Sequence, residues 1–284
     1  MKAEYPNFVP LVTPSKGFEE LSKLIVDAEL CSLCGGCAAL CERIELSKSG
    51  PKIKEGVECN LIIGGIKCSE DGSCYDACPM APFSWAELET LIFGKTAADD
   101  ELGVYQEIVA VRSKDSKILE NAQDGGAVTS LLVAGVQEDL LDGAIVASRT
   151  DDWVPEAKIA KTRDEILAAA GTKYSRTPSA SLIVEAFREG GRNVALVGTG
   201  CQNVAVRRLE HGSLKNVPNI DISLIGLFCY ENFPYDDLKD SFRDLFGVEM
   251  PNILKQDITK GKFILTKEDG SEVKVGVRKF DSIV

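Results

Sequence analysis

The 284-residue sequence contains a single histidine, His211, and no long apolar run. Histidine is the commonest metal ligand and a frequent proton carrier near neutral pH, so its scarcity argues against most histidine-based catalysis and metal binding. The apolar runs fall well short of the roughly 18 residues that a membrane-spanning helix needs. The first residues also lack the apolar stretch of a signal peptide. We therefore expect a soluble, cytoplasmic protein with no direct membrane insertion.

Basic residues are in the minority, because 32 lysines and arginines face 44 aspartates and glutamates, which gives a net charge of −12. A nucleic-acid partner requires a basic surface, so we expect none. The sequence also lacks a Walker A loop and a G-x-S-x-G motif. These absences disfavour the P-loop nucleotide hydrolases and the serine hydrolases that carry such motifs.

Cysteine, by contrast, is concentrated in one stretch: eight of the ten cysteines lie between residues 31 and 78. The spacing C-x2-C-x2-C-x3-C, typical of a bacterial [4Fe–4S] ligand run, is formed by Cys31, Cys34, Cys37 and Cys41. Gly35 and Gly36 inside this run predict that the backbone passes close to the cluster. A looser second run contains Cys59, Cys68, Cys74 and Cys78-Pro79.

Two such runs in tandem predict a two-cluster ferredoxin module, in which the fourth cysteine of each run binds the other cluster. We assign one [4Fe–4S] cluster to Cys31, Cys34, Cys37 and Cys78. We assign the second cluster to Cys59, Cys68, Cys74 and Cys41. A structural zinc site is the alternative, because zinc sites also use C-x2-C pairs. Disulfides are disfavoured, because cytosolic thiols stay reduced.

The chain divides into three predicted parts: an N-terminal strap (1–25), a ferredoxin-like iron–sulfur module (26–100) and an α/β domain (101–284). In the α/β domain, strand-like and helix-like patterns alternate. The predicted strands are 107–111, 144–147, 194–197 and 222–228, followed by a hairpin of 263–265 and 273–275 around Asp269-Gly270. The predicted helices are 126–140, 166–170, 179–187, 203–209 and 235–245.

Three glycine-rich turns fall at strand–helix junctions of this domain, at residues 123–129, 170–175 and 198–202. Ligands of open α/β sheets collect where loops leave the carboxyl ends of strands, and a helix N-terminus attracts phosphate. The turns therefore favour a redox cofactor, although none matches G-x-G-x-x-G. Cys201 and Cys229 each follow a predicted strand, a placement that suits ligands of a further metal centre. The alternative is that both are small buried side chains.

The phrases at 122–126, 169–174, 200–202, 229–235 and 260–263 resemble the family of coenzyme F420 hydrogenase/dehydrogenase beta subunits. This family includes F420-linked hydrogenase, dehydrogenase, formate dehydrogenase and sulfite reductase subunits, and some chlorophyll-pathway reductases. The resemblance covers roughly residues 104–265, and the cysteine module is similar to that of the dehydrogenase-type members.

The resemblance implies an FAD, with coenzyme F420 as the substrate that docks against it. It also implies that Cys201 and Cys229 bind a third [4Fe–4S] cluster together with cysteines further along the chain. The implied partners are redox subunits of the hydrogenase, formate dehydrogenase, heterodisulfide reductase, sulfite reductase or membrane dehydrogenase type. The implied FAD-binding residues are Gln123, Asp124, Gly125, Gly126, Thr129, Gly171, Thr172, Lys173, Tyr174, Ser175 and Arg176.

The resemblance predicts an F420-dependent oxidoreductase in which FAD links a hydride donor to one-electron clusters. The direction of electron flow stays open. Two alternatives are a ferredoxin-type electron carrier without flavin and a reductase of another substrate on the same fold. Because F420 is an anion, we also expect a local basic patch, for which the available residues are Lys161, Arg163, Lys173, Arg176, Arg207 and Arg208.

Overall fold

The computed structural model describes residues 17–57, 62–63, 66–67, 72–96 and 103–280. Its main sheet has four strands in the order β6-β5-β7-β8, with β5, β7 and β8 parallel and β6 antiparallel to β5. The strands are β5 (Gly143–Arg149), β6 (Pro155–Ala160), β7 (Asn193–Thr199) and β8 (Asp221–Leu227). The predicted mixed α/β domain is therefore present.

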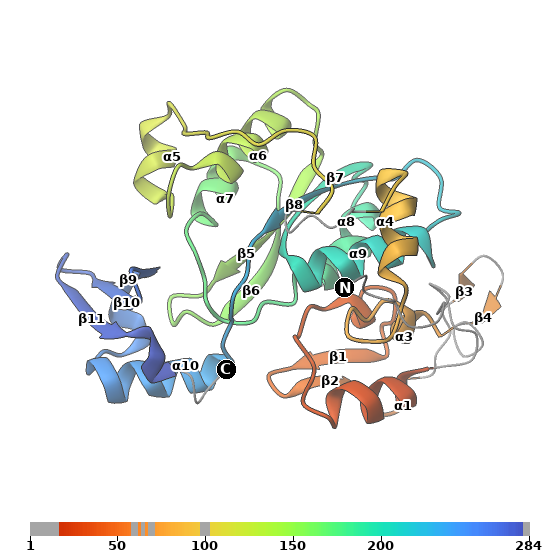
Figure 1. Cartoon of the computed structure of the whole chain (residues 1–284), viewed down its shortest axis with the longest axis horizontal. Helices are drawn as coiled ribbons and strands as arrows, with labels where there is room; N and C mark the ends of the chain where they lie inside the picture. Colours follow the sequence, from red (N-terminus) through yellow and green to blue (C-terminus); the bar gives the residue numbers. More distant parts are fainter. Residues whose placement is uncertain (1–16, 58–61, 64–65, 68–71, 97–102, 281–284) are drawn as a thin grey trace, which may run out of the picture.

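Helices cover both faces of this sheet (Figure 1). Side chains alternate along β5, so Ile145 packs on the α8 and α9 side, whereas Ala144 and Val146 pack on the α6 and α7 side. The helices are α5 (Ser116–Asn121), α6 (Ala127–Gln137), α7 (Arg163–Ala168), α8 (Ile183–Arg188), preceded by the 3₁₀ turn Ser179–Leu182, and α9 (Gly200–His211).

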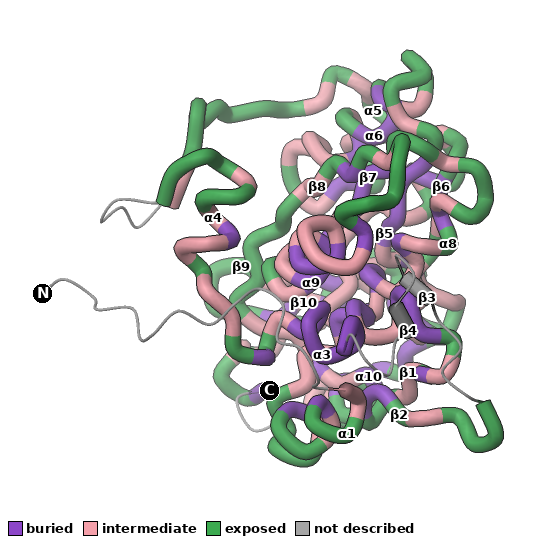
Figure 2. The backbone as a smooth tube through the Cα atoms, turned by 90° about the vertical axis from the view of Figure 1, so that its right-hand side faces the viewer, coloured by how far each residue is buried: buried purple, intermediate pink, exposed green. Residues whose placement is uncertain are grey.

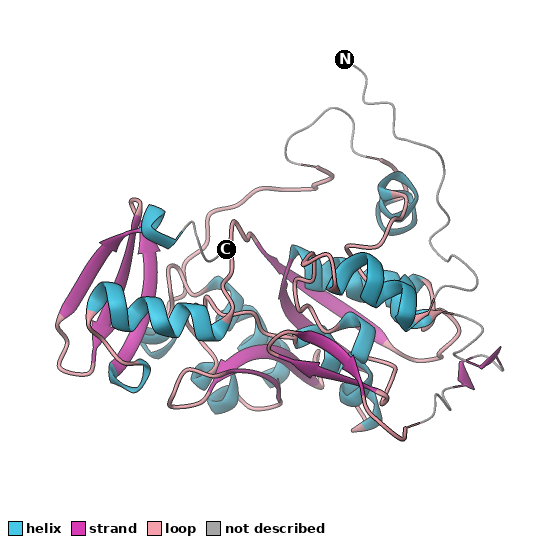
Figure 3. Cartoon of the chain, turned by 90° about the horizontal axis from the view of Figure 1, so that it is seen from below, coloured by secondary structure: helices cyan, strands magenta, loops and turns pink. Residues whose placement is uncertain are grey.

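The C-terminal part forms a second, antiparallel sheet of order β11-β10-β9. Phe263 on β10 is fully buried and stacks with Tyr174 and Phe242 at centroid distances of 5.0 and 5.1 Å. Figure 3 shows a helix packed across this sheet. The elements are α10 (Tyr235–Ser241), the π-helical turn Phe242–Phe246, the 3₁₀ turns Met250–Asn252 and Val277–Phe280, β9 (Ile253–Thr259), β10 (Lys262–Lys267) and β11 (Glu272–Gly276).

The described part of the cysteine module is built from short elements. They are α1 (Phe18–Leu21), the π-helical turn Ser22–Val26, the 3₁₀ turn Gly36–Ala38, β1 (Ile44–Ser47), β2 (Gly50–Ile53), β3 (Ile62–Ile63), β4 (Ile66–Lys67), α3 (Ser73–Asp76) and α4 (Trp85–Phe93). The strands form two hairpins, β1–β2 and β3–β4. Figure 2 shows α3 almost entirely buried beside α9. The ferredoxin-like character of the module stays a prediction.

The predicted strand at 107–111 is wrong. The segment is irregular, and Ile108, Val109 and Val111 are 69%, 61% and 63% exposed. A strand pattern becomes a strand only where a neighbouring backbone completes its hydrogen bonds, and the described part of the chain provides no such neighbour for this segment. Strand β6 and strand β9 were not predicted, whereas the hairpin around Asp269-Gly270 is confirmed as β10–β11.

Gly35 and Gly36 hold the module against the α/β domain. A Cβ on Gly36 would lie 2.7 Å from the Cβ of Ala205 on α9, and one on Gly35 would lie 2.6 Å from the carbonyl oxygen of Pro178. These glycines thus permit a close approach to the neighbouring domain, while the predicted approach of this backbone to a cluster stays a prediction. The amide of Ala180 donates to the carbonyl oxygen of Cys34 at 3.1 Å across the same contact.

We predict that Gly36→Ala lowers the free energy of unfolding by about 1–3 kcal/mol, because the added methyl group overpacks the contact with Ala205. Urea unfolding measures the change. Gly17→Ala is the matched control, because a Cβ at Gly17 meets no atom within 4 Å. An unchanged midpoint for Gly36→Ala would show that the contact with α9 adapts without cost.

Candidate functional site

A cleft opens at the carboxyl ends of β5, β7 and β8. Its volume of about 660 Å³ lies within the range of small-molecule and cofactor sites. Val146 of β5, Thr199 of β7 and Leu227 of β8 line it, as expected for a ligand site of an open α/β sheet. All three glycine-rich turns that the sequence singles out contribute to its walls.

The structure brings together ten of the eleven predicted cofactor-binding residues, since all except Arg176 line this cleft. Arg176 lies behind the wall, where its Nε donates to Oδ1 of Asn232 at 3.2 Å, and Asn232 lines the cleft. Predicted from sequence as metal ligands, Cys201 and Cys229 line the same cleft. Other lining residues, outside the predicted cofactor-binding and metal-binding sets, include Ser32, Thr177, Phe228 and Tyr230.

Helix α6 begins inside the cleft, and no side chain caps it. Its first amides therefore point toward the cleft, and an uncapped helix N-terminus of this length favours a phosphate group. Gly126 caps the helix with φ +72°, a left-handed conformation that favours glycine. A Cβ at this position would lie 2.8 Å from Cγ2 of Ile118. A side chain at position 126 would therefore clash with the protein itself, whether or not a ligand is bound.

Gln123 supplies a polar group that the protein leaves unpaired. Its Oε1 is buried and has no hydrogen-bond partner among the described residues. Buried acceptors are normally paired, so this oxygen suits an N–H donor of a bound ligand. Together with the α6 N-terminus and the cleft volume, this atom makes the site a good fit for a dinucleotide with a polar ring system such as FAD.

The ammonium group of Lys173 is hydrogen-bonded to the backbone of the protein. Nζ donates to the carbonyl oxygens of Ala169, Ala170 and Gly171, the last two at 3.0 and 3.1 Å. It thus caps the end of α7 and shapes the loop that follows. Burial lowers the pKa of Lys173 to about 8, and the positive charge of Arg149 contributes to this shift. Lys173 also lines the cleft, so its charge would act on an anionic group bound there.

Four of the six residues available for a local basic patch are paired with a carboxylate or buried. Lys161 pairs with Glu189, Arg163 with Asp115 and Arg207 with Glu210, the N–O distances being 2.6, 2.6 and 2.5 Å; Arg208 is buried beside the cysteine module. Of the six candidates, Lys173 and Arg176 remain near the cleft.

Tyr174 holds the same loop from the other side. Its hydroxyl oxygen accepts a hydrogen bond from the amide of Ile258 on β9 at 2.9 Å, and burial raises its pKa to about 12. The C-terminal sheet therefore fixes the position of residues 171–175 in the cleft.

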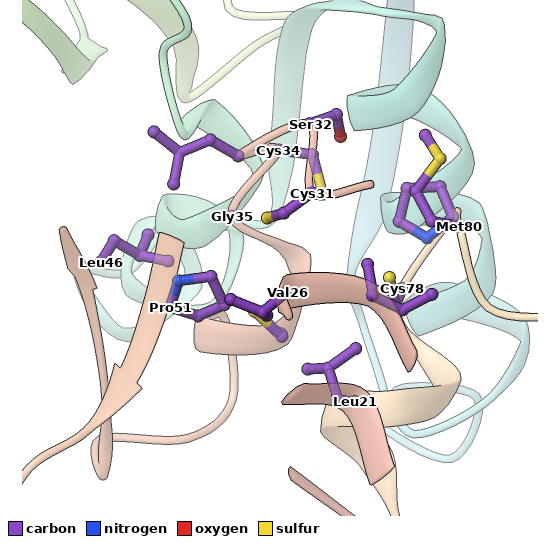
Figure 4. A pocket seen from close by; sticks show the side chains of 14 residues that line it. Leu21, Val26, Cys31, Ser32, Cys34, Gly35, Leu46, Pro51, Cys78 and Met80 are labelled. Atoms are coloured by element: carbon purple, nitrogen blue, oxygen red, sulfur yellow. The ribbon is translucent and has the colours of Figure 1, made fainter. Parts of the chain in front are cut away.

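A second cavity gathers the four cysteines assigned to the first cluster. Figure 4 shows Cys31, Cys34 and Cys78 around one pocket, which Cys37 also lines. Cys41 is not among the lining residues; it packs instead with Cys74, its predicted partner in the second cluster. Cys59 and Cys68 lie outside the described residues.

Burial raises the pKa of Cys34 to about 12 and also raises the pKa of Cys37 and Cys78. Raised pKa values favour the protonated thiols, and a metal centre bound here would have to displace these protons. Within the described ranges, no three candidate ligands surround a single metal-ion position. Four thiolates that each bind a different iron of a cubic core stand further apart than ligands of one ion. The all-sulfur donor set and the apolar lining, which includes Leu21 and Ile25, suit such a core.

The two cavities adjoin each other. Ser32 lines both of them. Burial is the main cause of the raised pKa of Cys34; a hydrogen bond from the amide of Gly36 lowers this pKa, and the nearby Cys201 raises it further. The pKa of Cys229 is raised by burial and then by Cys201. The predicted metal ligands thus extend from the cysteine cavity into the cleft.

The fold and these sites define a class of protein that the sequence comparisons identify. The profile of the N-terminal domain of coenzyme F420 hydrogenase/dehydrogenase beta subunits matches residues 108–184, and that of the C-terminal domain matches residues 191–284. The chain therefore belongs to the family of coenzyme F420 hydrogenase/dehydrogenase beta subunits.

Individual relatives include the coenzyme F420 hydrogenase subunit beta of Methanosarcina barkeri, 41% identical over 63% of this chain and 63% of that protein. The coenzyme F420-dependent sulfite reductase of Methanocaldococcus jannaschii is 29% identical over 90% of this chain and 39% of its own length. A solved structure of the F420-reducing [NiFe] hydrogenase complex from Methanosarcina barkeri contains a chain with 38% identity and a TM-score of 0.57, aligned over 61% of this chain and 60% of that one. The chain thus spans less than two thirds of the hydrogenase beta subunits it matches. No helix in the described part of the chain is long and apolar enough to cross a membrane.

The buried lysine predicts a pH dependence of stability. Between about pH 8 and 10.5, Lys173 is protonated in the unfolded chain but largely neutral in the folded one, so the stability of the fold rises with pH across this window. We expect Lys173→Met to remove a gain of the order of 1–3 kcal/mol. Urea unfolding at the two ends of the window measures it. The exposed Lys239→Met should keep the gain; an identical pH dependence in both variants would contradict the prediction.

Proposed function

We propose that this chain is an F420-dependent oxidoreductase subunit that exchanges electrons between coenzyme F420 and iron–sulfur clusters through FAD. The observation that carries the proposal is the position of Ser32: the cleft with the glycine-rich turns and the cavity of the cysteines share this residue as a wall. The names of the relatives support F420 as the substrate.

The residues of the cleft would bind and orient the cofactor. The amides of the α6 N-terminus would hold its phosphates, and Oε1 of Gln123 would accept a hydrogen bond from its ring. Bound FAD supplies the chemistry that accepts a hydride and releases single electrons. Phe228 and Tyr230, which are fully or almost fully exposed at the rim, offer aromatic faces to a planar substrate ring.

In this proposal, the cysteines of the second cavity hold the first cluster, and Cys41, Cys74, Cys59 and Cys68 hold the second. Cys201 and Cys229 supply half of a third site, which other cysteines would complete. A redox subunit of the kind found with the relatives would accept or deliver the electrons. The cytoplasm is the compartment in which we expect the protein.

Anaerobic reduction of a viologen dye tests the proposed activity, with reduced F420 as the donor and NADH and NADPH as controls. We expect dye reduction with reduced F420 but not with NADH or NADPH. We also expect acid to release one FAD per chain. Clusters without flavin and without F420 activity would instead identify an electron carrier. Clusters and flavin without F420 activity would identify a reductase of another substrate.

Crossed ligation predicts how iron content responds to two substitutions. Cys31→Ser and Cys78→Ser each remove one ligand of the same cluster, so each should lower the iron content from about eight to about four atoms per chain. The double variant should lose no more iron than either single variant. If each cysteine run bound its own cluster, the double variant would lose nearly all of the iron.

The left-handed turn before α6 predicts the effect of a side chain at Gly126. The left-handed conformation costs a residue with a Cβ about 1–2 kcal/mol, and the clash with Ile118 adds to this cost. We expect Gly126→Val to weaken FAD binding by about tenfold or more, measured by flavin retention during dialysis. Gly200→Ala is the control, because a Cβ there meets no atom within 4 Å. Equal retention in both variants would place the flavin elsewhere.

A further inference from the structure

Helix α9 presents one face to the cysteine module. Cys201, Ala205 and Arg208 stand at positions i, i+4 and i+7, which fall on the same side of a helix. Cys201 lines the cleft, Ala205 is fully buried against Gly36, and Arg208 is 4% exposed. The face that begins at the cleft therefore ends at an arginine inside the module.

Arg208 binds the backbone around Cys78. Its Nη1 donates to the carbonyl oxygen of Cys78 at 2.6 Å and to that of Ala81 at 3.1 Å. Its guanidinium carbon lies 4.5 Å from the centre of the Phe83 ring. Residues 78–83 are thus folded around one guanidinium group. A structural role alone would be served by a neutral donor, whereas a buried charge carries a large desolvation cost.

The charge also has an incomplete set of partners. Nε of Arg208 is buried and has no hydrogen-bond partner within the described structure. The nearby groups that act on it include Asp76, which is itself 6% exposed, Cys78 and Tyr75. Burying the charge of Arg208 beside Cys78 costs desolvation free energy. A negatively charged cluster bound by Cys78 would explain why a positive group is kept there.

We propose that Arg208 is a positioning residue for Cys78 whose fixed charge raises the reduction potential of the cluster held by Cys31, Cys34, Cys37 and Cys78. The inference rests on the proposed function, because it requires that cluster. Four thiolates around an iron–sulfur core make an anion, and each added electron increases its negative charge. A nearby cation in a medium of low dielectric constant stabilises the reduced form more than the oxidised form.

The experiment compares the unmodified full chain with Arg208→Gln, Arg208→Lys and Arg207→Gln after anaerobic cluster assembly. Iron and acid-labile sulfide report cluster content, and a redox titration followed by electron paramagnetic resonance reports the midpoint potential. Arg207→Gln is the matched control, because it removes the same charge from the adjacent residue, which pairs with Glu210. We expect a more negative potential in Arg208→Gln and potentials close to the original in Arg208→Lys and Arg207→Gln.

An Arg208→Gln protein with full iron content and an unchanged potential would overturn the inference and leave the proposed function intact. Equal shifts in Arg208→Gln and Arg207→Gln would overturn it as well, because the effect would then be general. If Arg208→Gln retains too little iron, Arg208→Lys decides: a potential close to the original supports the role of the fixed charge, and a clearly lower potential despite the retained charge overturns it. Absence of iron from the unmodified chain would overturn the proposed clusters and this inference together.

Discussion

The contact between Gly36 and Ala205 determines how close the cysteine module lies to helix α9. Because neither residue has a side chain beyond Cβ, the two backbones approach within a distance that no larger pair would allow. Cys34, Ala39 and Leu40 then join the same hydrophobic cluster as Ile145 and Leu196 of the main sheet. This part of the module and the α/β domain share one core, so Cys34 inherits the rigidity of a close-packed interior.

The cleft is held in shape from two directions. The parallel strands place three loops at one edge of the main sheet, and the C-terminal sheet supports the 171–175 loop through Tyr174. A parallel bridge between Ser175 and Phe233 joins the same loop to the segment that follows Cys229. The loop that carries much of the predicted cofactor contact is therefore anchored on both sides.

Periodicity and loop position predicted the parts of the structure that depend on local pattern. Strands β5, β7 and β8 and helix α9 follow from alternation, and the common cleft follows from the rule that ligands gather at the carboxyl ends of strands. The strand at 107–111 was wrong because pairing is a tertiary property. The contacts of Gly36 and Ser32 were equally out of reach, since each depends on a segment distant in the sequence. The seven-residue spacing from Cys201 places Arg208 on the same face of the predicted helix. The sequence does not show, however, that this face packs against the cysteine module.

Helix α9 connects the cleft to the cysteine module without a break. Enzymes whose domains move between two positions rely on hinge residues that absorb large changes in backbone dihedral angles. After Gly200, α9 contains no glycine and no proline, so it offers no such hinge, and its 12 residues form a rod of about 18 Å. Helix α9 itself therefore provides no point of bending between the cleft and the module. In the proposed function, electron transfer between the cleft and the cysteine cavity would then be controlled by which substrate or partner binds, because bending of α9 does not alter the distance.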